Sequence, residues 1–329
     1  DLVRSRGLGD VYKRQMFNHD VNLTGYTMST APDTNETLWT YTTGGEFVLT
    51  QPAIKDGKLY ILSCDGIFYC LNESTGVPIW TTNLVDAFGA PVTSRSTAAV
   101  VDGKVYGAIF DPTPGKVFCL NANTGNLIWE FTGISNFAAS PVVIDGKLYI
   151  TEYGGVAYCL NATTGAPIWS NTAPGSMITS TPAIADGKMY FGTLWNSPNP
   201  NKVYCLDATT GAHIWNYTAE ASMLHVLVVD GKLYADQSAV WGQPGRVYCL
   251  NATTSAHIWN FTTAGSNNSP LSVHGDRLFF GSYDKNMYCI DKNTGALIWS
   301  YMTGGAIAYS VPAISGDGKV LIGSTDGGL

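Results

Sequence analysis

Two tryptophans, Trp195 and Trp241, lie in enlarged loop sequences, whereas the other seven tryptophans recur in one register. The loops are Leu194–Asn201 and Gln237–Gly245, and Asn, Ser, Gln and Pro surround each indole. Exposed aromatic rings with a polar rim can stack on a sugar ring or capture a peptide. We therefore predict a binding surface for a protein or glycan there. The alternative is that each indole packs its own loop.

Four more candidate contact residues precede or begin predicted inner strands: Arg95, His225, Asn268 and Tyr309. Arg95 would bind an anion, and His225 would face a central channel. The alternatives are a solvated arginine and a histidine with a structural hydrogen bond. The loops that enter the predicted inner strands also carry these residues: Phe47, Gln51, Ser96, Phe137 and Met177.

Catalytic groups are not indicated by the spacing of the acidic residues or the cysteines. The acidic residues on the candidate face come from different parts of the chain and form no pair: Glu46, Asp86, Asp111, Glu152 and Asp236. Six cysteines occupy one repeated position, where we expect small buried side chains, and Cys64 lies on a predicted second strand. No glycine-rich loop leads from a strand into a helix, and no helix is expected. We predict no catalytic residue and no metal site.

A repeat of about 43 residues must position these candidates, because Trp39 and Trp299 are 260 residues and six intervals apart. An aromatic-Cys-aliphatic-Asn/Asp step precedes each of the seven repeated tryptophans except the first, and Asp-Gly-Lys turns occur further upstream. The pattern predicts four short antiparallel strands per repeat and hence an all-β propeller. A solenoid of hairpins is the alternative. We expect an indole between neighbouring blades at the repeated positions: Trp39, Trp80, Trp129, Trp169, Trp215, Trp259 and Trp299.

The stretch from Asn161 to Trp169 (NATTGAPIW) and its copies resemble the tryptophan-docking motif of pyrroloquinoline-quinone-type (PQQ-like) β-propellers. The resemblance runs from Leu38 to the C-terminus. That family contains quinoprotein dehydrogenases and non-catalytic outer-membrane assembly lipoproteins, so the repeat implies the fold and leaves the function open. We expect seven blades, the last incomplete and closed by a strand at Glu36–Thr42. A truncated eight-bladed ring is the alternative.

The N-terminal residues are expected to differ from the rest of the chain. Residues 1–15 resemble a translated sequencing adapter, residues 16–35 would lead into the fold, and residues 36–329 would form the propeller. We interpret the chain as a fragment of a longer gene product.

Composition limits the partner and the compartment. The formal net charge is −7 and no basic run occurs, which argues against nucleic acid. No apolar run is long enough for a transmembrane helix. We expect a monomeric ring. A surface poor in Lys and Glu and eight Asn-x-Ser/Thr sequons favour an extracytoplasmic protein: Asn22, Asn35, Asn72, Asn161, Asn216, Asn251, Asn260 and Asn267.

Two functions remain for such a chain. The first is a non-catalytic binding propeller without a cofactor. The second is a quinone-dependent dehydrogenase, which would need PQQ, a calcium site rich in carboxylates and a platform such as a vicinal disulfide. The sequence contains no adjacent cysteine pair and no such acidic cluster. We therefore favour the binding protein.

Overall fold

The computed structural model describes residues 37–45, 51–89, 91–173, 177–194, 201–238 and 243–326. The chain divides into two compact units at Ala173/Pro174. Among the described residues, no helix is long and apolar enough to cross a membrane.

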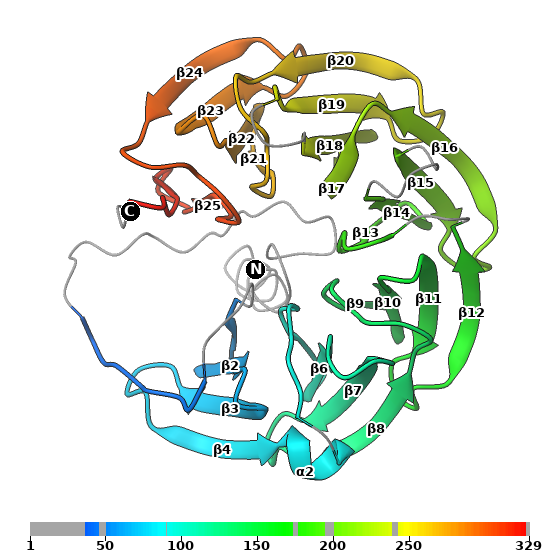
Figure 1. Cartoon of the computed structure of the whole chain (residues 1–329), viewed down its shortest axis with the longest axis vertical. Helices are drawn as coiled ribbons and strands as arrows, with labels where there is room; N and C mark the ends of the chain where they lie inside the picture. Colours follow the sequence, from blue (N-terminus) through cyan, green and yellow to red (C-terminus); the bar gives the residue numbers. More distant parts are fainter. Residues whose placement is uncertain are drawn as a thin grey trace, which may run out of the picture. The chain divides into compact units, whose positions relative to one another are not determined.

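Unit 1 contains three four-stranded antiparallel sheets, each a simple meander in chain order (Figure 1). Sheet 1 comprises β1 (Ala53–Lys55), β2 (Lys58–Leu62), β3 (Ile67–Asn72) and β4 (Pro78–Asn83). Sheet 2 comprises β5 (Ala99–Val101), β6 (Lys104–Ala108), β7 (Lys116–Asn121) and β8 (Leu127–Thr132). Sheet 3 comprises β9 (Val142–Ile144), β10 (Lys147–Thr151), β11 (Val156–Asn161) and β12 (Pro167–Thr172).

Unit 2 repeats the same meander three times and begins a fourth sheet. Sheet 4 comprises β13 (Ala183–Ala185), β14 (Lys188–Gly192), β15 (Asn201–Asp207) and β16 (His213–Ala219). Sheet 5 comprises β17 (Ser222–Val229), β18 (Lys232–Ser238), β19 (Arg246–Asn251) and β20 (His257–Thr262). Sheet 6 comprises β21 (Ser272–His274), β22 (Arg277–Gly281), β23 (Asn286–Asp291) and β24 (Leu297–Met302). Sheet 7 has two described strands, β25 (Ala313–Ile314) and β26 (Val320–Leu321).

The repeated turns account for this regular pattern. Between the first and second strands of sheets 1 to 5, an Asp-Gly pair adopts positive φ angles, as in Asp56 (φ 51) and Gly57 (φ 71). Between the third and fourth strands, an Asn or Asp side chain accepts backbone N–H groups from the next residues, as Asn161 does from Thr163 and Thr164. In all six complete sheets the register of the third and fourth strands shifts at the cysteine just before this turn.

We call the turn between the third and fourth strands a docking turn, because four of the described turns receive a tryptophan from the preceding sheet of the same unit. Trp80 donates its Nε1–H to the carbonyl oxygen of Ala122 at 3.0 Å, and Trp129 donates to Ala162 at 3.1 Å. A glycine lies under the indole: a Cβ at Gly125 (φ +75) would meet Trp80 at 2.6 Å. The glycine is needed both for its left-handed backbone and for this close approach.

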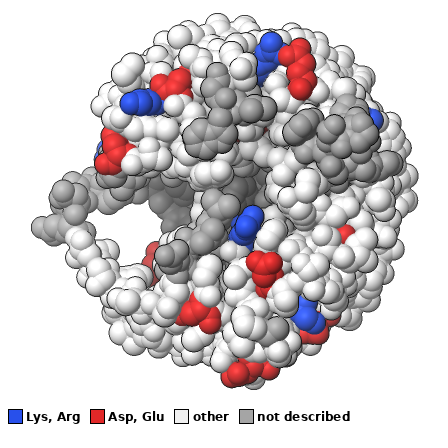
Figure 2. Space-filling view, in the orientation of Figure 1, with Lys and Arg blue, Asp and Glu red and all other residues white. Residues whose placement is uncertain are grey.

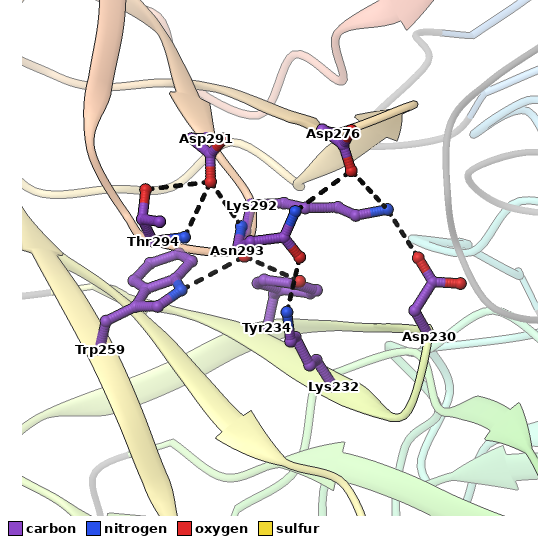
Figure 3. Close-up of polar contacts among 9 residues, drawn as sticks. All are labelled: Asp230, Lys232, Tyr234, Trp259, Asp276, Asp291, Lys292, Asn293 and Thr294. Carbon is purple, nitrogen blue, oxygen red and sulfur yellow. Dashed lines mark hydrogen bonds and ion pairs between the residues drawn. The ribbon is translucent and has the colours of Figure 1, made fainter.

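The junction between sheets 5 and 6 shows the whole arrangement (Figure 3). The Lys292 carbonyl accepts from both Trp259 Nε1 (3.2 Å) and Tyr234 Oη (3.0 Å). The Lys292 side chain is buried and its Nζ lies 2.6 Å from Asp230 Oδ2. Alanine occupies the position of Lys292 in four other docking turns, at residues 122, 162, 208 and 252. This junction therefore adds an ion pair to the shared indole contact.

The six repeated cysteines are free and buried. Burial raises the pKa of Cys70 to about 11 and that of Cys119 to about 12. Both thiols therefore stay protonated at neutral pH and contribute as small apolar side chains. Cys64 is half-buried and follows β2 in a turn, so its predicted place on the second strand is wrong.

Two further expectations about secondary structure need correction. The expectation that the chain contains no helix is wrong, because the structure has a short helix, α2 (Leu84–Phe88). Asn83 caps its first turn, and Gly89 (φ 73) ends it. Residues 37–43, which cover most of the strand expected at Glu36–Thr42, are assigned no strand. A strand requires a hydrogen-bonded ladder, and this segment is instead anchored by Trp39, whose Nε1 donates to Glu73 at 2.8 Å.

Candidate functional site

The first candidate surface, the Arg95 patch, comprises Arg95, Phe110 and Tyr153 in unit 1. The exposed Arg95 guanidinium lies 4.0 Å from the centre of the Phe110 ring, and Phe110 meets Tyr153 edge to face with ring centres 6.0 Å apart. Arg95 lies in the loop before β5, and Phe110 and Tyr153 lie two residues after the ends of β6 and β10. A guanidinium over an aromatic face is held by a cation–π attraction. The patch is therefore a pre-ordered cationic and aromatic contact surface.

The loop around Phe110 is fixed by its neighbours. Thr93 and Asp111 form an isolated β-bridge, and the Thr93 hydroxyl donates to Asp111 Oδ2 at 2.9 Å. On the other side, the backbone N–H of Tyr153 donates to the carbonyl of Asn136 at 2.7 Å. These bonds anchor both loops, so the three side chains keep their relative positions without a ligand.

The second candidate surface, the Tyr309 patch, comprises Asn268, Tyr283 and Tyr309 in unit 2. Tyr309 is 55% exposed and adopts φ +58, a costly backbone conformation for an aromatic residue. Its N–H donates to the Asn268 carbonyl at 2.7 Å, and the side chains of Asn268 and Tyr309 both hydrogen bond to Tyr283. Burial raises the pKa of Tyr283 above its ordinary value. Bulky non-glycine residues at positive φ occur often at functional sites.

His225 forms a pair with the fully buried Asp236. The strand β17 bulges between Met223 and His225, and this brings the His225 backbone N–H to 2.7 Å from Asp236 Oδ1 and its Nδ1 to 3.0 Å from Oδ2. Because a carboxylate only accepts, the proton lies on Nδ1 and Nε2 is left as an acceptor. The structural hydrogen bond of His225 is present, and it uses Nδ1, not Nε2.

Glu152 is a second buried carboxyl group, at the end of β10. Its Oε2 accepts from the backbone N–H groups of Ile134 (3.1 Å) and Ser135 (3.3 Å), whereas its buried Oε1 has no partner. Burial raises the pKa of Glu152 against these bonds. In sheet 5 the equivalent position holds Gln237, which accepts from Tyr248 Oη at 2.7 Å. The group therefore joins the end of a strand to the next loop.

The other sequence candidates separate into buried and undescribed residues. Trp195, Trp241 and Phe47 lie outside the described residues, so their predicted role stays a prediction. Phe137 is fully buried, and Ser96 donates to the Ala108 carbonyl at 3.1 Å inside unit 1. Neither is available to a ligand because the loops that carry them fold into the sheet ends.

Sequence reasoning missed Phe110, Tyr153 and Tyr283. All three occupy one repeat position, the second residue after the second strand, which is aromatic in sheets 2, 3 and 6. Aligning the repeats by the aromatic-Cys-aliphatic-Asn/Asp step and the second strand before it could have found them. Asp86 belongs to the cap of α2, and Asp111 and Asp236 are paired as described above.

Charged residues are scattered on the face that Figure 2 shows, and most of the described surface there is uncharged. Within the part of the chain that the structure describes, no three His, Cys, Asp or Glu side chains form a group that could hold a metal ion.

Comparison with known protein families gives the family. The profile of outer membrane protein assembly factor BamB matches residues 23–133, 113–243 and 230–329. The chain belongs to this family. A crystal structure of BamB from Moraxella catarrhalis superposes with a TM-score of 0.69 over 86% of this chain and 87% of that chain, at 20% identity. The fold is therefore a β-propeller, as predicted, and the solenoid alternative is excluded.

Sequence relatives match a smaller part of the chain. BamB from Yersinia pestis is 30% identical over 131 residues, which is 36% of this chain and 32% of the relative. The quinoprotein alcohol dehydrogenase PedH from Pseudomonas putida is 28% identical over 130 residues, covering 21% of that enzyme. The quinohemoprotein alcohol dehydrogenase of Comamonas testosteroni shares the fold with a TM-score of 0.60 at 15% identity. The matched region thus spans about a third or less of the length of these sequence relatives.

Proposed function

We propose that this BamB-family chain is a non-catalytic scaffold, exported from the cytoplasm, that binds a protein through the loops carrying the Arg95 and Tyr309 patches. The matched relatives named as outer membrane assembly factors support a role in assembling other proteins. The low content of charged residues supports an extracytoplasmic location. The proposal needs no cofactor.

The observation that carries the proposal is the ordered stack of Arg95 on Phe110 and Phe110 on Tyr153. Arginine and aromatic residues are enriched at the energetic centres of protein interfaces. A stack that is already ordered loses little side-chain entropy when a partner covers it. The Tyr309 patch adds an exposed phenol whose orientation is fixed by Asn268.

A photo-crosslinking experiment tests this proposal. A photoreactive phenylalanine analogue would replace Arg95 or Tyr309, one at a time, in cells that contain the natural partners. Matched controls carry it at the exposed Thr163 and Thr253, which lie in docking turns at the opposite strand ends. We expect a discrete crosslinked protein from the first pair only. Equal crosslinking at all four positions would contradict the proposal.

The alternative, a quinoprotein dehydrogenase, rests on the more distant resemblance to PedH and the quinohemoprotein enzyme. It is tested by adding PQQ and Ca²⁺ and recording the absorbance spectrum and dye-linked alcohol oxidation. We expect no stoichiometric spectral change and no turnover. A tight one-to-one signal would replace our proposal with the enzyme.

A glycan remains a second kind of partner for the loop surface. Trp195 and Trp241 were predicted to stack on it or on a peptide, and the double variant Trp195→Ala with Trp241→Ala tests this. We expect lost retention on the partner without a change in thermal stability. A marked loss of stability would instead assign both indoles to loop packing.

A further inference from the structure

The positive charge of Arg95 is not paired with an acidic side chain in the described part of the chain. Its guanidinium lies 4.0 Å from the centre of the Phe110 ring, and no described carboxylate is within ion-pair distance. A guanidinium presents its N–H donors in a planar fork that matches the two oxygens of a carboxylate. Because Arg95 is exposed and already oriented by the ring, it can receive a carboxylate from a partner.

Ile134 is an exposed apolar residue that adjoins the Arg95 patch. It is 74% exposed, and its backbone N–H donates to Oε2 of Glu152, the residue directly before Tyr153. Small residues donate in the same way to an acidic side chain in two other sheets: Gly44 to Asp65 and Ala264 to Asp284. The backbone contact therefore does not require a bulky side chain, and the isoleucine is available to a partner.

The loop at residues 110–115 joins these features into one surface of unit 1. Its residues Pro112 and Pro114 are exposed, and the Thr113 hydroxyl hydrogen bonds to Asn136 Oδ1 at 2.6 Å. The carbonyl of Asn136 in turn accepts from the backbone N–H of Tyr153 at 2.7 Å. We call the combined surface the sheet 2–3 surface, and its members are Arg95, Phe110, Pro112, Pro114, Ile134 and Tyr153.

The carboxyl group beneath this surface is buried, whereas its counterparts elsewhere are only half-buried. Asp65 and Asp284 are each the third residue after a second strand. In sheet 3 that position holds Gly154, and the fully buried Glu152 accepts the loop N–H instead. The sheet 2–3 surface thus lacks an accessible negative charge that two other sheets have, which removes a repulsive group from the approach of an acidic partner.

We infer that the partner presents an acidic, apolar peptide segment to the sheet 2–3 surface, an inference that rests on the proposed function. An aspartate or glutamate side chain of the segment pairs with the Arg95 guanidinium. Neighbouring aliphatic or aromatic side chains of the segment cover Ile134 and Tyr153. The charge pair sets the position of the segment, and the apolar contacts remove exposed surface from water.

The first experiment pans the full chain against random heptapeptides displayed on phage, with the carboxyl end of each peptide fused to the coat protein. We expect enriched sequences in which an aspartate or glutamate stands beside aliphatic or aromatic residues. The formal net charge of the chain is −7, so its overall charge does not favour acidic peptides. Panning against Arg95→Gln should remove the preference for acidic residues.

Anisotropy measurements with one enriched peptide, synthesised with an amidated C-terminus and a fluorescent label, locate the binding site. Arg95→Gln should weaken binding roughly tenfold. A peptide whose acidic residue is replaced by its amide should bind the wild type more weakly, and Arg95→Gln should weaken that peptide no further. Ile134→Ala should weaken binding roughly fivefold, whereas the control Ile128→Ala, an exposed isoleucine on β8, should leave it unchanged.

Asp111 supplies a test of the opposite sign. It is exposed, follows Phe110 directly, and accepts a hydrogen bond from the Thr93 hydroxyl at 2.9 Å. Asp111→Asn keeps an acceptor for this bond and removes a negative charge from the sheet 2–3 surface. The variant should therefore bind the acidic peptide roughly twofold more tightly, and weaker binding would contradict the assigned charge pair.

Three further outcomes would overturn the inference. They are enrichment of no sequence or only of sequences without acidic residues, equal binding to the wild type and to Arg95→Gln, and binding only by peptides with a free C-terminal carboxylate. A discrete photo-crosslink at position 95 combined with any of these results would leave the proposed function standing and remove only the acidic segment.

Discussion

Trp259 and Trp299 occupy the same repeat position in neighbouring sheets, yet their surroundings differ. Trp259 is 8% exposed, donates to the Lys292 carbonyl and covers Gly295. Trp299 is half-buried and lies next to Phe279, with ring centres 6.0 Å apart. Tyr234, the counterpart of Phe279, donates to the same carbonyl as Trp259. We therefore expect a docking tryptophan to stabilise the fold most where a turn receives it.

The largest difference should appear when each indole is removed. Trp259→Ala should lower the free energy of unfolding by about 3–5 kcal/mol, because it leaves a cavity between two sheets. Trp299→Ala should lower it by less than about 1 kcal/mol, since much of its ring is already in contact with solvent. Urea unfolding followed by circular dichroism measures both. Equal losses would show that exposure does not separate the two positions.

Substitution of the turn glycine tests the same junction from the other side. Gly295→Ala should cost about 2 kcal/mol, because Gly295 has φ +74 and its new Cβ would lie 2.8 Å from Trp259. Gly318→Ala, with φ +82 and no atom within 4 Å of the new Cβ, should cost about 1 kcal/mol from backbone strain alone. Thermal unfolding of the two variants provides the comparison. A larger loss at Gly318 would contradict the packing argument.

Glu152 and Gln237 occupy the same repeat position, at the end of the second strand in sheets 3 and 5, and differ in whether the side chain can carry a charge. The pKa of Glu152 is raised in the folded state, so the folded protein holds this proton more tightly and loses stability as the pH rises through that window. Glu152→Gln should therefore stabilise the protein at pH 7.5, by about 1 kcal/mol, and have less effect at pH 4.5. Melting temperatures at both pH values measure this. A destabilised variant at pH 7.5 would mean that the charge is needed.

The smallest change in the free energy of unfolding is expected at Lys292, which stands in the docking turn of sheet 6 where four other docking turns have alanine. Lys292→Ala restores the residue of the other turns and removes the pair with Asp230, whose side chain is 64% exposed. Pairs with an exposed partner contribute little, so the change should stay below about 1 kcal/mol and shrink further in high salt. Urea unfolding at low and high salt tests this. A loss as large as that of Trp259→Ala would make the ion pair the main contact.

The repeat made the fold predictable, because local signals for the strands and turns recur along the chain. Asp-Gly pairs form the first turns of sheets 1 to 5, and the docking motif forms the last turn of all six complete sheets. Helix α2 escaped prediction because its cap, Asn83 to Gly89, occurs once in an otherwise regular pattern.

The candidate site was less accessible to sequence reasoning. Arg95, Asn268 and Tyr309 were placed on loops, but their aromatic partners Phe110 and Tyr283 were not identified. The contacts between them join loops about 15 residues or more apart in sequence. Similarly, Asp236 was assigned to an exposed surface, whereas the bulge in β17 buries it against His225. Contacts between residues of different loops leave no local pattern in the sequence.

The central claim, that Trp299 is an open docking residue while its equivalents are closed, is tested most directly by ¹⁹F NMR of the chain labelled with 5-fluorotryptophan. Single Trp→Phe variants assign the resonances, and the change of solvent from H₂O to D₂O reports the exposure of each ring. We predict a large solvent isotope shift for Trp299 and small ones for Trp80, Trp129 and Trp259. A Trp299 resonance as protected as that of Trp259 would contradict the account.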